Sequence, residues 1–147
     1  MKGKKGLTVV GVFRPETGER QEMPFFTARI SAGFPSPADD YMDRKLDLNE
    51  YLIKHPAATF FVRVEGESMI GAGIHSGDIL IVDRALEPAD HKIVIAVLNG
   101  ELTVKRIKKT KGKLCLIPDN SAYQPIEVTP EMNLEVWGVV THVIHPV

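Results

Sequence analysis

The sequence predicts a small, mainly β domain with one or two short helices near its start and an extended N-terminal arm. From Thr59 onward, apolar residues occur in short runs of strand length that are separated by turn residues. Asn99-Gly100 lies between two of these runs and is typical of a two-residue hairpin turn. A chain of 147 residues with 44% hydrophobic and 25% charged residues is sufficient for one globular core.

Composition excludes several classes of protein. The net charge of -1, from 18 basic and 19 acidic residues, does not favour nucleic acid as the main partner. Cys115 is the single cysteine, so neither an internal disulfide nor a cysteine-rich metal site is expected, and a reducing compartment fits. Apolar runs such as Ile93–Leu98 are too short to span a bilayer, and the basic start is a poor signal peptide. We therefore expect a cytoplasmic protein without a membrane partner.

The first third of the chain differs from the rest. Leu7–Phe13 is a short strand-like run, a turn-like stretch follows at Arg14–Gly18, and Phe25–Ile30 is a second extended candidate. Residues 1–32 contain too little apolar surface for a core of their own. This arm is expected to lie on the remainder of the chain or to stay mobile.

A connector and two short helices are predicted next. Ser31–Pro37 contains two prolines and a glycine, which favour an extended segment. Ser36 is placed to cap a first short helix that continues through Met42 to about Lys45. Asp47 is placed to cap a second helix over Leu48–Ile53.

Six further strands complete the predicted domain. Because the runs are short and joined by turns, we expect mainly antiparallel pairing. The predicted strands are Thr59–Val64, Ile79–Asp83, Lys92–Leu98, Glu101–Lys108, Lys113–Ile117 and Leu134–Ile144.

Ser68 is the first candidate for chemistry. It follows a predicted strand in a turn, where a hydroxyl can project beside backbone N–H groups that receive an oxyanion. Local sequence alone favours the plainer interpretation of a turn serine that caps a helical turn. The lipase-type G-x-S-x-G elbow does not fit, because Ile70 occupies the position of its second glycine.

A nucleophilic serine needs a base, and histidine and lysine are the two possibilities. The five histidines are scattered, with no spacing that defines a triad and no H-E-x-x-H motif, so surface or packing roles and no metal site are expected. Residues 105–113 carry six cations, a pattern typical of a solvated or phosphate-contacting face. Lys105 alternates with Ile107 on a rigid hairpin strand, so it is the best candidate for a partly buried, neutral lysine. Leu102 and Val104 mark the opposite side of this strand as apolar too, which weakens the assignment.

Ala32-Gly33 is the third element. A small residue followed by glycine in an extended connector threads easily into a narrow protease cleft, and an intramolecular attack there would gain a large effective molarity. The alternative is a flexible joint between arm and core.

Together these elements resemble the LexA/UmuD group of self-cleaving serine peptidases, and its UmuD-like branch in particular. The resemblance covers the chain from about Gln21 onward. It is carried by the following segments: Ala32–Ala38, Asp47–Asn49, His55–Val62, Gly66–Met69, Ser76–Asp83, Thr103–Lys105 and Asn120–Tyr123.

The resemblance implies roles for individual residues. Ser68 would be the nucleophile and Lys105 the general base, the backbone amides of Ser68 and Met69 would form the oxyanion hole, and the Ala32–Gly33 bond would be cut. Residues 1–32 would then be an arm removed by self-cleavage, and residues 33–147 the Ser–Lys protease and polymerase-accessory domain. No cofactor is implied.

The resemblance also implies partners. UmuD-like proteins form homodimers, cut themselves on a RecA–single-stranded DNA filament in the SOS response to DNA damage, and then serve a UmuC-type error-prone translesion polymerase. Sequence-specific DNA binding is not expected, because the strand-like and proline-interrupted segment before the cut does not resemble a helix-turn-helix. The alternatives are a fragment of a LexA-like or phage-type repressor and a non-catalytic binding module.

Overall fold

The computed structural model describes residues 6–16, 18, 22–26 and 42–147, with backbone alone for 22–26 and 42–45. The chain divides into two compact units. The larger contains the residues up to Pro15 together with His55–Val147, and the smaller contains Glu16–Lys54. The predicted connector Ser31–Pro37, the helix start at Ser36 and the Ala32–Gly33 pair lie outside the described residues.

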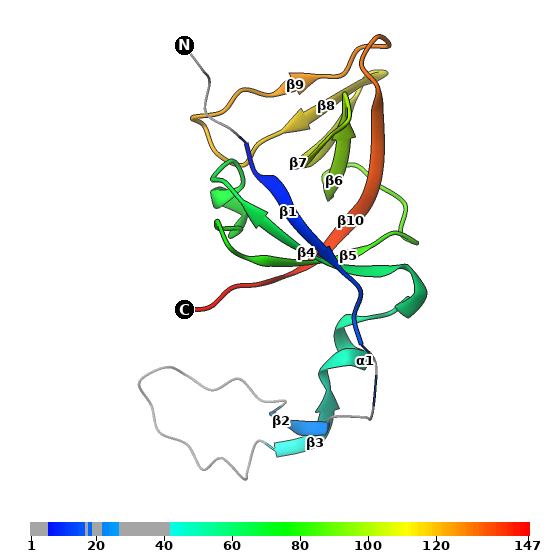
Figure 1. Cartoon of the computed structure of the whole chain (residues 1–147), viewed down its shortest axis with the longest axis vertical. Helices are drawn as coiled ribbons and strands as arrows, with labels where there is room; N and C mark the ends of the chain where they lie inside the picture. The colour runs from blue at the N-terminus through cyan, green and yellow to red at the C-terminus, as the bar shows by residue number, and fades with distance from the viewer. Residues whose placement is uncertain (1–5, 17, 19–21, 27–41) are drawn as a thin grey trace. The chain divides into compact units, whose positions relative to one another are not determined.

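The larger unit is built on one antiparallel eight-stranded sheet (Figure 1). Thr8 also pairs with Thr103 across the two ends of its first six strands, so these strands close into a barrel. In sheet order the strands are β1 (Thr8–Phe13), β4 (Thr59–Glu65), β5 (Ile79–Asp83), β10 (Leu134–Ile144), β6 (Ile93–Leu98), β7 (Glu101–Thr110), β8 (Lys113–Ile117) and β9 (Ile126–Glu127).

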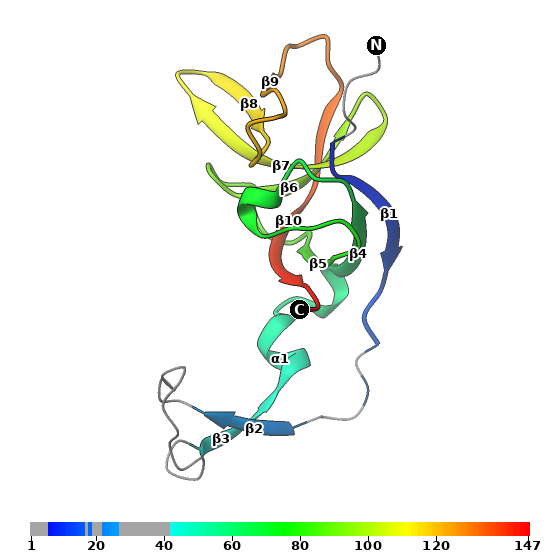
Figure 2. The same ribbon diagram turned by 90° about the vertical axis from the view of Figure 1, so that its left-hand side faces the viewer.

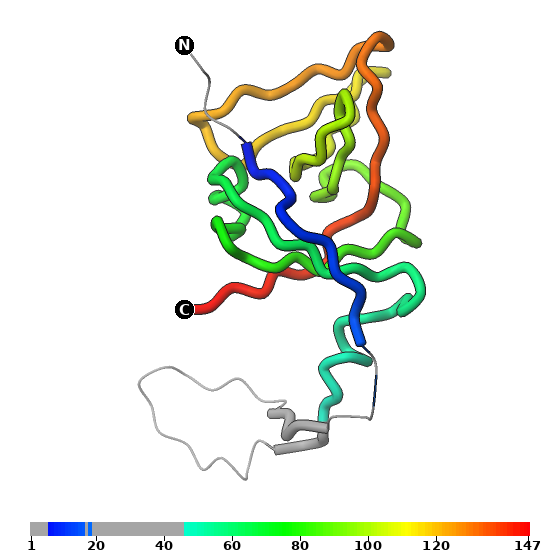
Figure 3. The backbone as a smooth tube through the Cα atoms, viewed as in Figure 1, coloured from blue at the N-terminus to red at the C-terminus, as the bar shows by residue number. Residues whose placement is uncertain are grey.

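The long strand β10 joins the two halves of the barrel. Its first part pairs with β6 and its second part with β5, with register shifts at Val136/Gly138 and Val140/His142. Such irregularities bend a strand and allow closure. A Cβ on Gly138 would lie 2.6 Å from a Val82 methyl carbon, so a larger residue would disturb this bend. Figure 3 shows the resulting curved path of β10 from the orange to the red end of the chain.

The β6–β7 hairpin fixes the position of Lys105. Leu98 pairs with Glu101, and Asn99 and Gly100 both have positive φ, of 50° and 83°, as the predicted two-residue turn requires. The register then places Lys105 opposite Val94 in the interior of the sheet. The hairpin prediction is confirmed.

The core of the barrel lies beneath β1, β4, β5 and β7. It consists of fully or almost fully buried aliphatic side chains, which include Leu7, Val62, Val64, Met69, Ile74, Leu80, Val82, Ile95 and Val104. Burial of this apolar area is the main force that orders the strands. Leu7 lies just before β1, so this residue of the predicted arm is part of the core.

The smaller unit contains β2 (Glu22–Phe26) paired with β3 (Met42–Asp47), followed by α1 (Leu48–Leu52). Asp47 caps α1 by accepting the backbone N–H groups of Asn49 and Glu50 at 2.9 and 3.4 Å, which confirms the second predicted helix. The first predicted helix is wrong over Met42–Lys45, which form a strand. A helix of two turns has a costly nucleus, so pairing with β2 outweighs the local capping signal.

The remaining strand predictions of the larger unit are confirmed within one or two residues, except that the short β9 was not predicted. The second extended candidate, Phe25–Ile30, overlaps β2 only at Phe25 and Phe26, and its remainder lies outside the described residues. The larger unit also contains two 3-10 turns, η2 (Pro56–Ala58) and η3 (Ile70–Ala72). Figure 2 shows β1 running beside β4 in a view at right angles to the first. Within the described ranges, no helix has the length and apolar character needed to cross a bilayer.

Candidate active site

Ser68 lies in the turn that leads from β4 into η3 and is fully buried. Gly66, two residues earlier, has φ +121°, a conformation that side chains rarely allow. A Cβ on Gly66 would lie 2.7 Å from the Gly6 carbonyl oxygen and 2.8 Å from the Leu7 Cα. The glycine is therefore needed both for the turn and for the close approach of a second segment.

Lys105 approaches Ser68 from β7. Its amine nitrogen lies 3.1 Å from the Ser68 Oγ, within hydrogen-bond distance, and the residue is only 5% exposed. Nζ also donates to the Thr103 Oγ1 at 2.9 Å and to the Val104 carbonyl oxygen at 3.0 Å. The structure therefore brings together the two side chains for which the sequence predicted a joint role.

The two other contacts of the amine orient it. A neutral lysine has two N–H groups and one lone pair. When the N–H groups donate to the Thr103 Oγ1 and the Val104 carbonyl, the lone pair is directed at the Ser68 hydroxyl. The neutral amine is then placed to accept the serine proton.

Burial of Lys105 increases the fraction of its amine that is neutral near pH 7. Loss of hydration lowers the pKa of Lys105 from its ordinary value of 10.5 to about 8. The structure gives Lys105 no carboxylate partner among the described residues that would stabilise the ammonium form. Further along β7, Lys108 and Lys109 are both exposed, so Lys105 is the buried lysine of this strand. Alternation accounts for Lys108 but not for Lys109, which has the same parity as Lys105.

A loop after β8 holds the Ser68 turn in place. Asp119 accepts the Gly71 N–H through its carbonyl at 2.7 Å and donates its own N–H to the Met69 Sδ at 3.3 Å. Its carboxylate binds the Arg106 guanidinium through both oxygens, the shortest contact being 2.6 Å, and raises the pKa of Arg106. Arg106 follows Lys105 directly, so this ion pair links the strand of the lysine to the turn of the serine.

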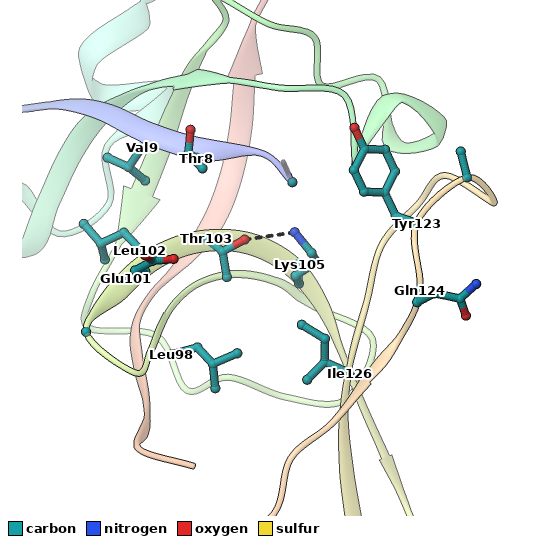
Figure 4. A pocket seen from close by; sticks show the side chains of 13 residues that line it. Thr8, Val9, Leu98, Glu101, Leu102, Thr103, Lys105, Tyr123, Gln124 and Ile126 are labelled. Carbon is teal, nitrogen blue, oxygen red and sulfur yellow. Dashed lines mark hydrogen bonds between the residues drawn. The ribbon is translucent and has the colours of Figure 1, made fainter. Parts of the chain in front are cut away.

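A cleft of about 920 Å³ opens beside the amine (Figure 4). Residues before and within β1 line one side, the β6–β7 hairpin lines its floor, and the loop with Tyr123 and Gln124 lies opposite. The lining is mostly apolar, with Leu98, Leu102 and Ile126 near the floor. Such a groove suits an extended peptide segment that approaches Lys105.

The remaining predictions for the site concern the partners of the Ser68 hydroxyl, the oxyanion donors and the bond to be cut. Among the described residues, Ser68 Oγ hydrogen-bonds to Lys105 and to the Leu7 N–H, and no histidine contacts it. Within the described part of the chain, the backbone N–H groups of Ser68 and Met69 donate no hydrogen bond to a protein acceptor. Ala32 and Gly33 lie outside the described residues.

A cluster of His75, Asp78 and His145 was not predicted. The buried Asp78 carboxylate accepts the His75 backbone N–H at 2.7 Å and lies 2.6 Å from the His145 Nδ1. The two imidazole rings stack at 4.5 Å. These histidines are distant in sequence and come together only through the pairing of β5 with β10, which no local motif signals.

The amino-acid sequence is similar to those of a known peptidase family and of several individual proteins. A family model described as Peptidase S24-like matches residues 24–141. Protein MucA of Salmonella typhimurium is 44% identical over 94% of this chain and 97% of its own length. Protein SamA of Salmonella typhimurium strain LT2 is 52% identical over 83% of this chain and 84% of its own length. A LexA repressor of Stenotrophomonas maltophilia is 35% identical over 80% of this chain and 56% of its own length.

Proposed function

Because the chain belongs to the Peptidase S24-like family, in its LexA/UmuD group, we propose that it is a self-cleaving serine peptidase that cuts its own Ala32–Gly33 bond. Ser68 acts as the nucleophile and Lys105 as the general base. The observation that carries this proposal is the 3.1 Å contact between a buried serine hydroxyl and a buried amine whose pKa is lowered to about 8. Ser–Lys pairs of this kind need a desolvated lysine.

The chemistry proceeds in two steps. Neutral Lys105 takes the Ser68 proton while Oγ bonds to the Ala32 carbonyl carbon, and the Ser68 and Met69 amides stabilise the oxyanion. The intermediate collapses, the Ala32–Gly33 C–N bond breaks, and the Lys105 ammonium gives its proton to the departing Gly33 amine. Lys105 then activates a water, which hydrolyses the acyl-enzyme and restores Ser68.

The bond to be cut belongs to the same chain as the active site, which explains why a serine and a lysine without a third catalytic side chain would be enough for cleavage. A tethered bond reaches the nucleophile at a high effective molarity, which for well-aligned groups is of order 10⁵ M or more. Glycine after the cut removes a side chain that would crowd Ser68 in the cleft. Restricting the access of the connector then becomes the means of control.

The biological role that we propose is the one implied by the UmuD-like resemblance. The chain would act in the cytoplasm as a homodimer, and a RecA–single-stranded DNA filament would stimulate its cleavage. The shortened form would serve a UmuC-type translesion polymerase. Similarity to MucA over 97% of that protein's length supports this role over that of a repressor, since the LexA repressor is matched over only 56% of its length.

One experiment separates the enzyme from a non-catalytic binding module. Purified protein is incubated between pH 7 and 10, and the products are identified by intact mass. The proposal requires a fragment that begins at Gly33 and is absent from the Ser68→Ala variant. Polymerase binding by a Ser68→Ala chain that remains uncut would show that binding and cleavage are separate activities.

A further inference from the structure

The two residues before β1 occupy the position in front of Ser68. The Leu7 N–H donates to the Ser68 Oγ at 2.7 Å. The Leu7 carbonyl accepts the Val104 N–H at 3.3 Å and the Thr103 hydroxyl at 3.2 Å. Backbone groups of this segment therefore bind the nucleophile and both residues that precede the base.

The segment is anchored rather than loosely apposed. The Leu7 side chain is fully buried in the barrel core, and Thr8 pairs with both Glu65 and Thr103. Gly6 passes so close to the base that a Cβ there would lie 2.9 Å from the Lys105 Nζ and 3.5 Å from the Ser68 Oγ. A residue without a side chain is what allows the backbone to cover this pair of groups.

The segment is seated in a way that does not favour its own cleavage. Its N–H points at Oγ, so the serine oxygen lies at the nitrogen edge of the Gly6–Leu7 peptide and serves as a hydrogen-bond acceptor. The Gly6 carbonyl oxygen lies against Gly66, and among the described residues it receives no hydrogen bond from the Ser68 or Met69 N–H. Attack needs the carbonyl oxygen in front of such donors.

We propose that Gly6–Leu7 is a resident occupant of the Ser68–Lys105 site and competes there with the Ala32–Gly33 bond. This inference rests on the proposed self-cleavage. Two backbone segments cannot both lie over one serine hydroxyl, so the cleavage rate scales with the fraction of molecules in which Gly6–Leu7 has withdrawn. The remainder of β1 stays paired with β4 from Val9 to Phe13, so withdrawal involves only the beginning of the segment.

The test compares spontaneous self-cleavage at pH 9 in three folded proteins: the full chain, a variant in which Met1 is followed directly by Thr8, and Leu7→Ala. The appearance of the fragment that begins at Gly33 gives the rate. Both variants should cut faster, by roughly tenfold if the site is vacant about a tenth of the time in the full chain. Val12→Ala is the matched control, because Val12 is an exposed residue of the same strand that pairs with Val62 away from Ser68.

A peptide added in trans tests occupancy directly. The octapeptide Gly6–Phe13, added to the deletion variant, should lower its cleavage rate, whereas the same peptide with leucine replaced by aspartate should not. Both variants are first checked by circular dichroism and thermal unfolding. Unchanged or slower cleavage by folded variants, or no inhibition by the peptide, overturns the inference.

A second readout keeps this inference separate from the proposed function. The rate at which a phosphonofluoridate reagent labels Ser68 reports access to the hydroxyl, whether or not Ala32–Gly33 is cut. Faster labelling of the deletion variant than of the full chain supports the resident segment, and equal labelling, including none in both, overturns it. Failure of every protein to yield a Gly33 fragment would instead contradict the proposed self-cleavage.

Discussion

The Lys105 Nζ and the Ser68 Oγ lie 3.1 Å apart although 37 positions separate the residues in sequence. The contact depends on the β6–β7 hairpin, which sets Lys105 in the sheet, and on the glycine turn after β4, which presents Ser68. Since both residues are buried, the amine is held in a medium where its neutral form is favoured.

The rate of self-cleavage should follow the titration of Lys105. Because burial lowers the pKa of Lys105 to about 8, the neutral base accumulates as pH rises through that value. We expect the first-order rate to increase about tenfold per pH unit below pH 7, to reach half its maximum near pH 8 and to level off above pH 9. Intact mass at timed intervals measures it. A flat profile, or cutting by Lys105→Arg, would exclude lysine as the base.

Replacing the lysine should stabilise the fold while abolishing the chemistry. The pKa of Lys105 is lowered from 10.5 to about 8 in the folded chain. Below pH 8 the lysine is charged in both the folded and the unfolded chain, so folding includes the full free-energy cost of burying an ammonium group. Above about pH 10.5 the lysine is neutral in both states, and this cost disappears. Lys105→Met should therefore raise the free energy of unfolding at pH 7 by about 1–3 kcal/mol, since one pKa unit corresponds to about 1.4 kcal/mol.

This gain should vanish toward pH 10–11, as measured by urea unfolding at several pH values. Lys108→Met, at an exposed position of the same strand, is the control and should change stability by less than about 0.5 kcal/mol. A lower free energy of unfolding for Lys105→Met than for the wild-type chain at pH 7 would show that burial of the charged amine does not destabilise the fold.

Thr103 should act by orienting the amine. Its Oγ1 accepts a Lys105 N–H at 2.9 Å, so Thr103→Val preserves shape and removes one of the two groups that turn the lone pair toward Ser68. Because the same hydroxyl donates to the Leu7 carbonyl in the full chain, the substitution is made in the variant in which Met1 is followed directly by Thr8. Loss of one such hydrogen bond is worth about 1 kcal/mol, which corresponds to a fivefold to tenfold lower rate at pH 9. Thr103→Ser, which retains the hydroxyl, should restore most of the rate. Equal rates for the valine and serine variants would remove Thr103 from this role.

The Arg106–Asp119 ion pair should support the serine turn. Asp119 is bound by Arg106 through two oxygens and contacts both Met69 and Gly71, whereas the Lys113–Glu127 pair is exposed and spans 3.6 Å. Asp119→Ala should lower the free energy of unfolding by about 1–2 kcal/mol and slow cleavage. Glu127→Ala should cost less than about 0.5 kcal/mol and leave cleavage unchanged. Equal effects of the two substitutions would contradict a supporting role.

Sequence could predict the barrel strands because Val- and Ile-rich runs and the Asn99-Gly100 turn are local signals. It could favour Lys105, because alternation along one strand separates this lysine from the exposed Lys108. Alternation could not separate it from Lys109, which has the same parity and is exposed because the strand leaves the core there. It failed over Met42–Lys45, where pairing with β2 overrides a capping signal. The contacts of Leu7 and Asp119 with the site could not be predicted, since both depend on the closure of the barrel and the path of a loop.

The most direct measurement is the N-terminal sequence of the fragment formed when the purified chain is held at pH 9, with Ser68→Ala held alongside. The account predicts one new chain that begins at Gly33 in the wild-type sample and none in the variant. A fragment that also forms in the Ser68→Ala sample, or a wild-type chain that remains whole, would contradict it.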